Sequence, residues 1–323
     1  MARLLTRTGQ AVLTFAIAVT LAFLLMRLTP GSPLPLLDEQ SKFTPAQEAR
    51  LKQLYHLDRP ILVQYTDFLS AAFRGDLGPS IRYTGQSVSG LIAARLPATF
   101  ILGLTVLLLN FTVGSWLGVW QAVREGSRLD HGLSLLSITL YAVPSFWLGL
   151  TLAWLFGLEW HLLPVAGMHD VLISPDSSLA TRSADLLYHL ILPAVTLSAV
   201  SIAATMRHQR SAMIEALRLD CIRTARAKGL RERDVIFRHA WRNAAGPMVT
   251  LFGLWLPILV TGTVFVEQVF NWPGLGSLAA EAIGNRDYPL IMGTTLLSAA
   301  VVVMGGLLAD LLHGAFDPRV RAL

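Results

Sequence analysis

The side chains that most often carry chemistry are few in this sequence, and they do not fall into catalytic patterns. The chain has only three lysines, Lys42, Lys52 and Lys228, and none follows a glycine, so the phosphate-binding loop G-x-x-x-x-G-K-[ST] is absent. There is no H-E-x-x-H and no G-x-S-x-G motif. The eight histidines are scattered, and even His161 and His169 lack the spacing of metal ligands. We therefore predict that the chain is not an enzyme by itself and has no metal site.

Residues 207–242 are the one stretch in which reactive side chains do form a pattern. It holds ten Arg or Lys against four Asp or Glu, a net charge of +6 (10 − 4), whereas the whole chain carries +5. Apolar residues recur on one helical face of this stretch. They are Ile214, Leu217, Cys221, Ile222 and Ala225.

A glycine divides this basic stretch. Gly229 stands where the first amphipathic helix would end, because glycine accepts the left-handed conformation of a helix C-terminus. We expect a second short helix from Arg231, with Val235, Ile236, Ala240 and Trp241 on its buried side. Two short helices broken at a glycine predict a compact, rigid projection suited to docking against another protein.

The elements that position this stretch are membrane spans, as the composition indicates. The chain has 323 residues, of which 53% are hydrophobic and only 15% charged, against roughly 25% charged in soluble domains. The isoelectric point near 9.7 is typical of nucleic-acid binding as well, but the basic residues flank apolar runs. Such flanking charge is explained by membrane topology, so we predict contact with membrane lipids and none with nucleic acid. The single Cys221 excludes an internal disulfide.

Six apolar runs have about the length that a bilayer requires, near 20 residues. Arg3 and Arg7 precede the first run and predict a cytoplasmic N-terminus. Alternation then places the C-terminus and the basic stretch in the cytoplasm too, and the cytoplasmic segments hold two, two, ten and two of the 26 basic residues. The predicted spans are Gln10–Leu28, Ala98–Trp120, Ser134–Gly157, Tyr188–Met206, Pro247–Val266 and Pro289–Leu312.

Three parts follow from this topology. Residues 1–96 comprise the first span and a small extracytoplasmic domain, residues 97–314 a core of five spans with the cytoplasmic loop 207–246, and residues 315–323 a cytoplasmic tail. The span interiors contain almost no ionisable side chain. Because proton- and ion-coupled carriers need such groups, the sequence favours an energy source outside this chain.

Several motifs in order along the chain resemble one family. The chain resembles the permease subunits of bacterial ABC importers for dipeptides and oligopeptides, a family that also includes nickel and glutathione permeases. The most specific match is RTARAKGL (223–230) with RHAWRNA (238–244), which is similar to the coupling loop of that family. The other matches are HLDRPILVQY (56–65), GDLGPS (75–80), RLPATF (95–100), VPSFWLGL (143–150), LPVAG (163–167), VEQVFNWPGLGSL (266–278), NRDYPLIMG (285–293) and FDPRVR (316–321).

The resemblance implies an all-α membrane protein, a bundle of six transmembrane helices of the type I ABC importer class in the bacterial inner membrane. The implied partners are a second homologous permease subunit, two ATP-binding subunits and an extracytoplasmic peptide-binding protein. ATP and magnesium would be bound by the partner subunits and no cofactor by this chain. The residues implied to couple the permease to the ATPase are Leu217, Asp220, Arg223, Thr224, Ala225, Arg226, Ala227, Lys228, Gly229 and Leu230.

A second set of residues is a candidate translocation path or outer gate: Pro144, Phe146, Glu267, Phe270 and Pro273. Two interpretations stay open for them. For Pro144 a tolerated kink and for Phe146 packing are the favoured explanations, whereas a well-packed turn held by Pro273 and Gly274 explains the segment around Glu267 equally well.

Three other functions also stay open. One is an importer of the same family for nickel or another small solute. Another is a stand-alone channel or secondary carrier, and the last is a membrane scaffold that transports nothing.

Overall fold

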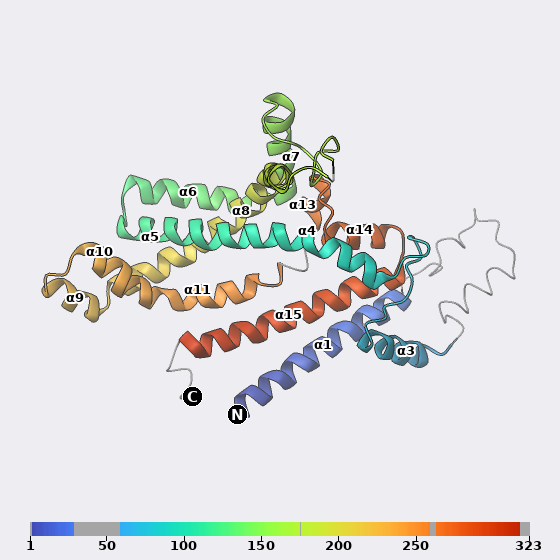
Figure 1. The fold of residues 1–323 in the computed structure, drawn as a ribbon. Helices are drawn as coiled ribbons and strands as arrows, with labels where there is room; N and C mark the ends of the chain where they lie inside the picture. The colour runs from blue at the N-terminus through green and yellow to red at the C-terminus, as the bar shows by residue number, and fades with distance from the viewer. Residues whose placement is uncertain (1, 29–58, 175, 259–262, 317–323) are drawn as a thin grey trace.

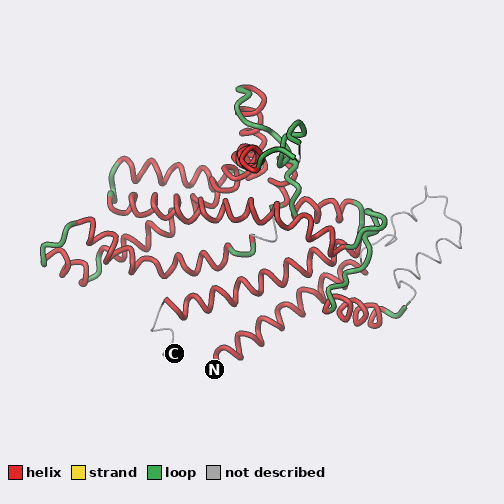
Figure 2. Tube along the Cα trace, viewed as in Figure 1, coloured by secondary structure: helices red, strands yellow, loops and turns green. Residues whose placement is uncertain are grey.

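The protein is mostly helical, without strands, in the residues that the computed structural model describes, which are 2–28, 59–174, 176–258 and 263–316 (Figures 1 and 2). No strand occurs among them, only an isolated bridge between Pro79 and Ser87. The helices are α1 Ala2–Leu28, α3 Ile61–Phe73, α4 Val88–Leu109, the π-helix η2 Asn110–Gly114, α5 Ser115–Val123, α6 Arg128–Ala142, α7 Ser145–Leu152, the π-helix η3 Ala153–Glu159, α8 Leu179–Leu217, α9 Asp220–Ala227, α10 Glu232–Asp234, the π-helix η4 Val235–Ala240, α11 Trp241–Trp255, α13 Val264–Val269, α14 Leu275–Gly284 and α15 Tyr288–Phe316.

Four helices are long and apolar enough to cross a membrane: Thr6–Leu28, Val88–Val123, Leu179–Leu217 and Tyr288–Leu308. They coincide with the first, second, fourth and sixth predicted spans and confirm them as long apolar helices. Several extend beyond the predicted bounds because amphipathic turns continue the helix. The second span, for example, begins at Val88 and passes through Pro97 without a break.

The third predicted span is not one straight helix. Residues 128–142 and 145–159 form two helices bent by 101° at a short break, and they give a fifth span only if the bent pair is taken together. The break lies at Val143, whose backbone is extended (φ −80°, ψ 126°). Val143 precedes Pro144, and the proline ring disfavours helical geometry in the residue before it.

The fifth predicted span, Pro247–Val266, is also not confirmed as a single helix. The helix α11 ends at Trp255 after 15 residues, residues 259–262 lie outside the described part of the chain, and α13 begins at Val264. Two short helices, α13 and α14, then precede α15.

Of the predicted extracytoplasmic domain, residues 29–58 lie outside the described part, as does the tail from residue 317. The helix α3 follows and packs its aromatic side chains on α1. Phe23 of α1 lies 5.2 Å from Tyr65 and 6.3 Å from Phe68, measured between ring centroids. The turn-rich segment before α4 is fixed to the start of α15, because the buried Asp287 accepts hydrogen bonds from the Ser80 hydroxyl and the Arg82 amide, the latter 3.0 Å long.

The long helix α8 is the central element, and α4, η2, α5, α6, α7 and α11 pack against it. A close approach lies at η2 and α5, where Gly114 of η2 and Gly118 of α5 face α8. A Cβ at position 118 would lie 2.6 Å from the Met206 carbonyl oxygen, so only glycine permits this spacing. Figure 1 shows α9 and α10 at one end of the bundle and α3 and α14 at the other; we name these the α9 end and the α14 end.

Candidate functional site

The basic stretch forms a projection at the α9 end, which we define as residues 218–240. The helix α8 runs to Leu217, after which Leu219 adopts an extended backbone (φ −66°, ψ 145°) and the chain turns into α9. The sequence predicted one helix across this point, and that prediction was wrong. No glycine or proline marks the break.

The second turn of the projection lies at the predicted glycine. Gly229 has a φ of +74°, the left-handed conformation that favours glycine. Its amide donates to the Arg226 carbonyl oxygen over 2.9 Å, which closes the end of α9. A Cβ built on Gly229 would meet nothing within 4 Å. No described residue therefore fills the space next to Gly229, which leaves it accessible to a partner.

The underside of the projection is fixed to the bundle by an apolar cluster. Ile222 and Ala225 of α9 and the η4 residues Val235, Ile236 and Ala240 are buried there, as the periodicity predicted. They pack on side chains of α8 and α5. These are Ala212, Met213 and Ala216 of α8 and Val119 and Ala122 of α5. The projection therefore moves with these two helices as one block.

Two details of this predicted buried face are wrong. Cys221 is exposed because the break before α9 rotates it out of the line of Ile214 and Leu217. Trp241 is 44% exposed, because it follows the π-helix η4, whose wider turn shifts the helical register.

The predicted coupling residues all lie on or next to the projection, but they do not all face outward. Leu217 and Ala225 pack on the apolar cluster and are oriented toward the protein's own chain. Exposed residues are Asp220, Arg223, Thr224, Arg226, Ala227, Lys228, Gly229 and Leu230. Four of these carry charge and two contribute apolar surface, a composition suited to a mixed polar and apolar protein interface.

The charges on the projection are partly paired with each other. Arg223 lies 3.4 Å from Asp220, and Arg226 lies 2.7 Å from Glu232. The hydrogen bond from Arg226 lowers the pKa of Glu232 below its ordinary value. The Arg226–Glu232 pair joins α9 to α10 across the Gly229 turn, while the Arg223–Asp220 pair lies within α9 and Lys228 adds an exposed positive charge at the turn.

Sequence reasoning missed three exposed apolar side chains of the same region: Leu219, Phe237 and Trp241. Each is between 40 and 50% exposed. The exposed apolar pair Leu219 and Leu230 flanks α9. No local pattern in the sequence separates them from the buried positions, because their exposure depends on the break at Leu219 and on the register shift in η4.

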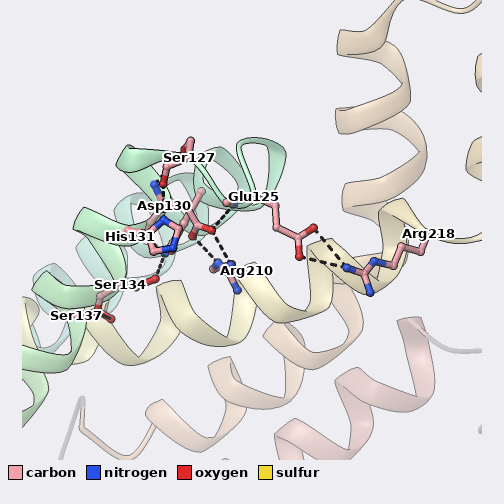
Figure 3. A network of polar contacts seen from close by, with 10 residues as sticks. Glu125, Ser127, Asp130, His131, Ser134, Ser137, Arg210 and Arg218 are labelled. Carbon is pink, nitrogen blue, oxygen red and sulfur yellow. Dashed lines mark hydrogen bonds and ion pairs between the residues drawn. The ribbon is translucent and has the colours of Figure 1, made fainter.

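A network of polar contacts joins the α5–α6 turn to α8 (Figure 3). Arg210 of α8 donates from Nε and Nη2 to the two carboxylate oxygens of Asp130, both over 2.7 Å. Arg218, just after α8, faces Glu125 at 3.2 Å. Sequence reasoning missed these pairs, since the partners are 80 and 93 positions apart.

The five candidate path residues lie where α7 approaches α13. Phe146 is 45% exposed and its ring lies 6.2 Å from that of Phe265. Pro144 is exposed and Pro273 half-buried. Glu267 and Phe270 are buried completely, Phe270 against Gly149 of α7. In this conformation only Pro144, Phe146 and Pro273 are accessible to a solute.

The described residues contain no group of three or more His, Cys, Asp or Glu side chains that could hold a metal ion. The nearest arrangement is Asp185, which contacts His169 at 3.0 Å and His189 at 3.1 Å. It fixes the loop before α8 onto the first turns of that helix.

Comparison with known proteins gives consistent matches. Residues 111–322 match the family described as binding-protein-dependent transport system inner membrane component. The oligopeptide transport system permease protein AppB of Bacillus subtilis is 39% identical over 301 residues, 93% of each chain. The chain belongs to this family of inner membrane transport components.

Two further relatives extend the match to nearly the whole length. The di/tripeptide transport system permease protein DppB of Pseudomonas aeruginosa is 38% identical, covering 98% of this chain and 97% of its own. The dipeptide transport system permease protein DppB of Escherichia coli is 36% identical, covering 98% of each chain. The family match includes the projection, the Asp130–Arg210 pair and all candidate path residues, while α1, α3 and α4 are covered by the relatives.

Proposed function

We propose that this chain is a permease subunit of an ATP-driven importer that moves dipeptides or oligopeptides across the bacterial inner membrane. It spans the membrane six times, with both termini and the projection in the cytoplasm. It pairs with a second homologous permease, and a peptide-binding protein delivers the solute from outside. Two ATP-binding subunits bind ATP and magnesium and push on the projection, which opens a path between the permeases alternately to each side.

The substrate class is supported by the relatives, whose names specify oligopeptides, di- and tripeptides and dipeptides. The mechanism is supported by one structural observation. The projection packs on α8 and α5 on its underside, yet a Cβ added at Gly229 would meet no atom of the described residues within 4 Å. Such an element transmits a push from a partner into two long helices without deforming itself.

A substitution series at Gly229 tests the coupling. Gly229→Ala strains the left-handed backbone by about 1 kcal/mol but adds little bulk. Gly229→Asn keeps that backbone at low cost and adds a side chain that only a partner can meet. We expect Gly229→Asn and Gly229→Asp to reduce ATP-dependent peptide uptake at least tenfold with normal membrane insertion, and Gly229→Ala to reduce it less.

The matched control is Gly85→Asn at the α14 end. Gly85 also has a positive φ, +82°, and also meets nothing within 4 Å of an added Cβ. It should transport normally. Normal ATP-dependent uptake by Gly229→Asn and Gly229→Asp would refute the coupling role.

The substrate is tested separately by competition. Vesicles with the intact complex take up a labelled dipeptide in the presence of excess oligopeptide, nickel or glutathione. Inhibition by nickel alone would favour the small-solute importer. Uptake by this chain without ATP or partner subunits would favour the stand-alone carrier.

A further inference from the structure

The helix α6 buries few side chains against the rest of the described protein. Only two of its residues, Asp130 and Ser137, are buried, and no α6 side chain belongs to any of the described apolar clusters. Its apolar residues are largely exposed, among them Leu135, Ile138 and Tyr141. The two buried side chains of α6 are therefore both polar, and the Tyr141 ring adds a contact with the Arg207 guanidinium group of α8, 4.9 Å from the ring centroid.

The strongest of these contacts is the pair of Asp130 with Arg210. The carboxylate is 3% exposed and receives two parallel hydrogen bonds of 2.7 Å from the guanidinium group. Such two-pronged contacts fix direction as well as distance, because the planar fork matches the planar carboxylate. Figure 3 shows Arg210 reaching from α8 toward Asp130 at the start of α6.

Asp130 is itself held rigidly on the α5–α6 side. Its Oδ2 also accepts a hydrogen bond of 2.9 Å from the Gly126 amide, and its own amide donates to the Ser127 hydroxyl over 3.2 Å. The Gln121 side chain of α5 donates to the Asp130 carbonyl oxygen over 3.0 Å and to the Ser134 hydroxyl over 2.7 Å. A displacement of Arg210 is thus passed to the end of α5 and to the first turn of α6 together.

On the other side, Arg210 lies close to the projection along one continuous helix. Leu217 lies seven positions further along α8, about 10 Å of helix. Met213 and Ala216, which lie between them, belong to the same apolar cluster as Ile222 of α9. Arg210 and α9 therefore belong to one rigid block.

The far end of α6 leads to the candidate path. The helix ends at Ala142, the chain bends at Val143 and Pro144, and α7 begins with Phe146 in its first turn. Over 15 residues, α6 is about 22 Å long, so a small rotation at Asp130 becomes a larger displacement at the bend.

We propose that Asp130 and Arg210 are positioning residues that force α6 to follow the projection, so that a push on α9 reaches the Pro144 bend through α6 as well as the bundle through α8. This proposal rests on the proposed function. Without the pair, α6 would follow α8 and α9 less closely, through its turn to α5 and its remaining contacts with α8. ATP would then be hydrolysed without opening of the path.

The experiment uses the complete complex of both permeases, the ATP-binding subunits and the binding protein in vesicles. It measures peptide taken up per ATP hydrolysed. We expect Asp130→Asn and Arg210→Gln to lower this ratio at least fivefold while solute-stimulated hydrolysis stays within twofold of the intact complex. Arg210→Lys keeps the positive charge but loses the two parallel hydrogen bonds to Asp130. It should give an intermediate ratio of peptide taken up to ATP hydrolysed.

Either single substitution leaves a buried or half-buried charge unpaired, and it can impair folding for that reason alone. The double variant Asp130→Asn with Arg210→Gln removes both charges and separates folding from coupling. We expect it to assemble as well as the intact chain and still to show the low ratio.

The exposed pair between the same two regions provides the control. Glu125 is 48% and Arg218 71% exposed, and such pairs contribute little. Glu125→Gln should keep the normal ratio. A double variant that assembles and couples normally would overturn the positioning role while the importer function stands. If the intact complex shows no ATP-dependent uptake, the proposed function fails and this inference fails with it.

Discussion

At the α9 end, charged pairs and an apolar cluster join the helices and leave one side of the projection exposed. At the α14 end, the buried carboxyl group of Glu267 accepts hydrogen bonds from the backbone of a closed turn. The first arrangement presents Asp220, Arg223 and Lys228 to the surroundings. In the second, Glu267, Phe270 and Trp272 are fully buried. Among the described residues, the projection at the α9 end carries exposed charged side chains, whereas the turn around Glu267 is filled by its own side chains.

The contacts at the α14 end explain its closure. The Glu267 carboxyl group accepts hydrogen bonds from the Thr263 amide over 3.2 Å and from the Ser277 amide over 2.8 Å. Trp272 donates from its indole nitrogen to the Ala98 carbonyl oxygen over 2.9 Å, which ties the turn to α4. A Cβ at Gly274 would lie 2.4 Å from the Glu267 carboxyl group, so the turn has no spare room.

The comparison bears on the candidate gate. A side chain that moves to admit a solute must lose little free energy when its contacts break. Movement of Glu267 would leave the amides of Thr263 and Ser277 without an acceptor, which costs free energy. The buried positions therefore favour the interpretation of residues 263–277 as a fixed cap. If a path opens here, these contacts predict that the cap keeps its position on α4.

The largest expected effect is on this cap. Glu267→Ala leaves the amides of Thr263 and Ser277 without an acceptor and creates a cavity, and we expect a loss of about 3–5 kcal/mol in stability. Glu267→Gln keeps one acceptor oxygen and should cost less. Thermal unfolding of the detergent-solubilised protein measures both.

Glu215→Gln, at an exposed position of α8, is the control for removing a carboxylate and should leave the melting temperature unchanged. If Glu267→Ala had the same melting temperature as the intact protein, the stability of the cap would not depend on this residue. The contrast between the two ends would then be lost.

An intermediate loss of stability is expected at the close contact between α5 and α8. Gly118→Ala places a Cβ 2.6 Å from the Met206 carbonyl oxygen and 2.7 Å from the Gln209 Cβ, so α5 must shift away from α8. Such overpacking costs about 1–3 kcal/mol. Because α5 also carries part of the apolar cluster under α9, uptake should fall together with thermal stability.

Gly132→Ala on α6 is the matched control. A Cβ there meets nothing within 4 Å, and alanine is the better helix former. We expect no loss of stability and normal uptake. Equal melting temperatures for the two variants would show that the close α5–α8 approach is not needed.

The sequence was a good guide where short-range patterns decide the structure. The periodicity of Ile222 and Ala225 predicted the buried side of α9, and the glycine at 229 predicted its end. The sequence also contained the signal for the bend at Pro144, but a proline alone does not separate a kink from a break of 101°.

The remaining features depend on contacts between distant segments. Nothing near Asp130 indicates that Arg210 will face it, because that contact is set by how α5, α6 and α8 pack. Glu267 is an acid in a predicted outer loop and would be expected at the surface. Its burial follows from the amides of Thr263 and Ser277, which the loop folds around it.

The smallest expected effect is at the α9 end and has a defined pH dependence. Arg226 and Glu232 are 46% and 56% exposed, so Glu232→Gln should cost about 0.5 kcal/mol or less at pH 7. Because Arg226 lowers the pKa of Glu232 from its ordinary value of 4.5, the pair stabilises the fold above that pH. The contribution is lost as the pH falls through the lowered pKa. Melting curves of the intact and substituted chains should therefore differ slightly at pH 7 and converge in acid, whereas a difference that grew in acid would contradict the pairing.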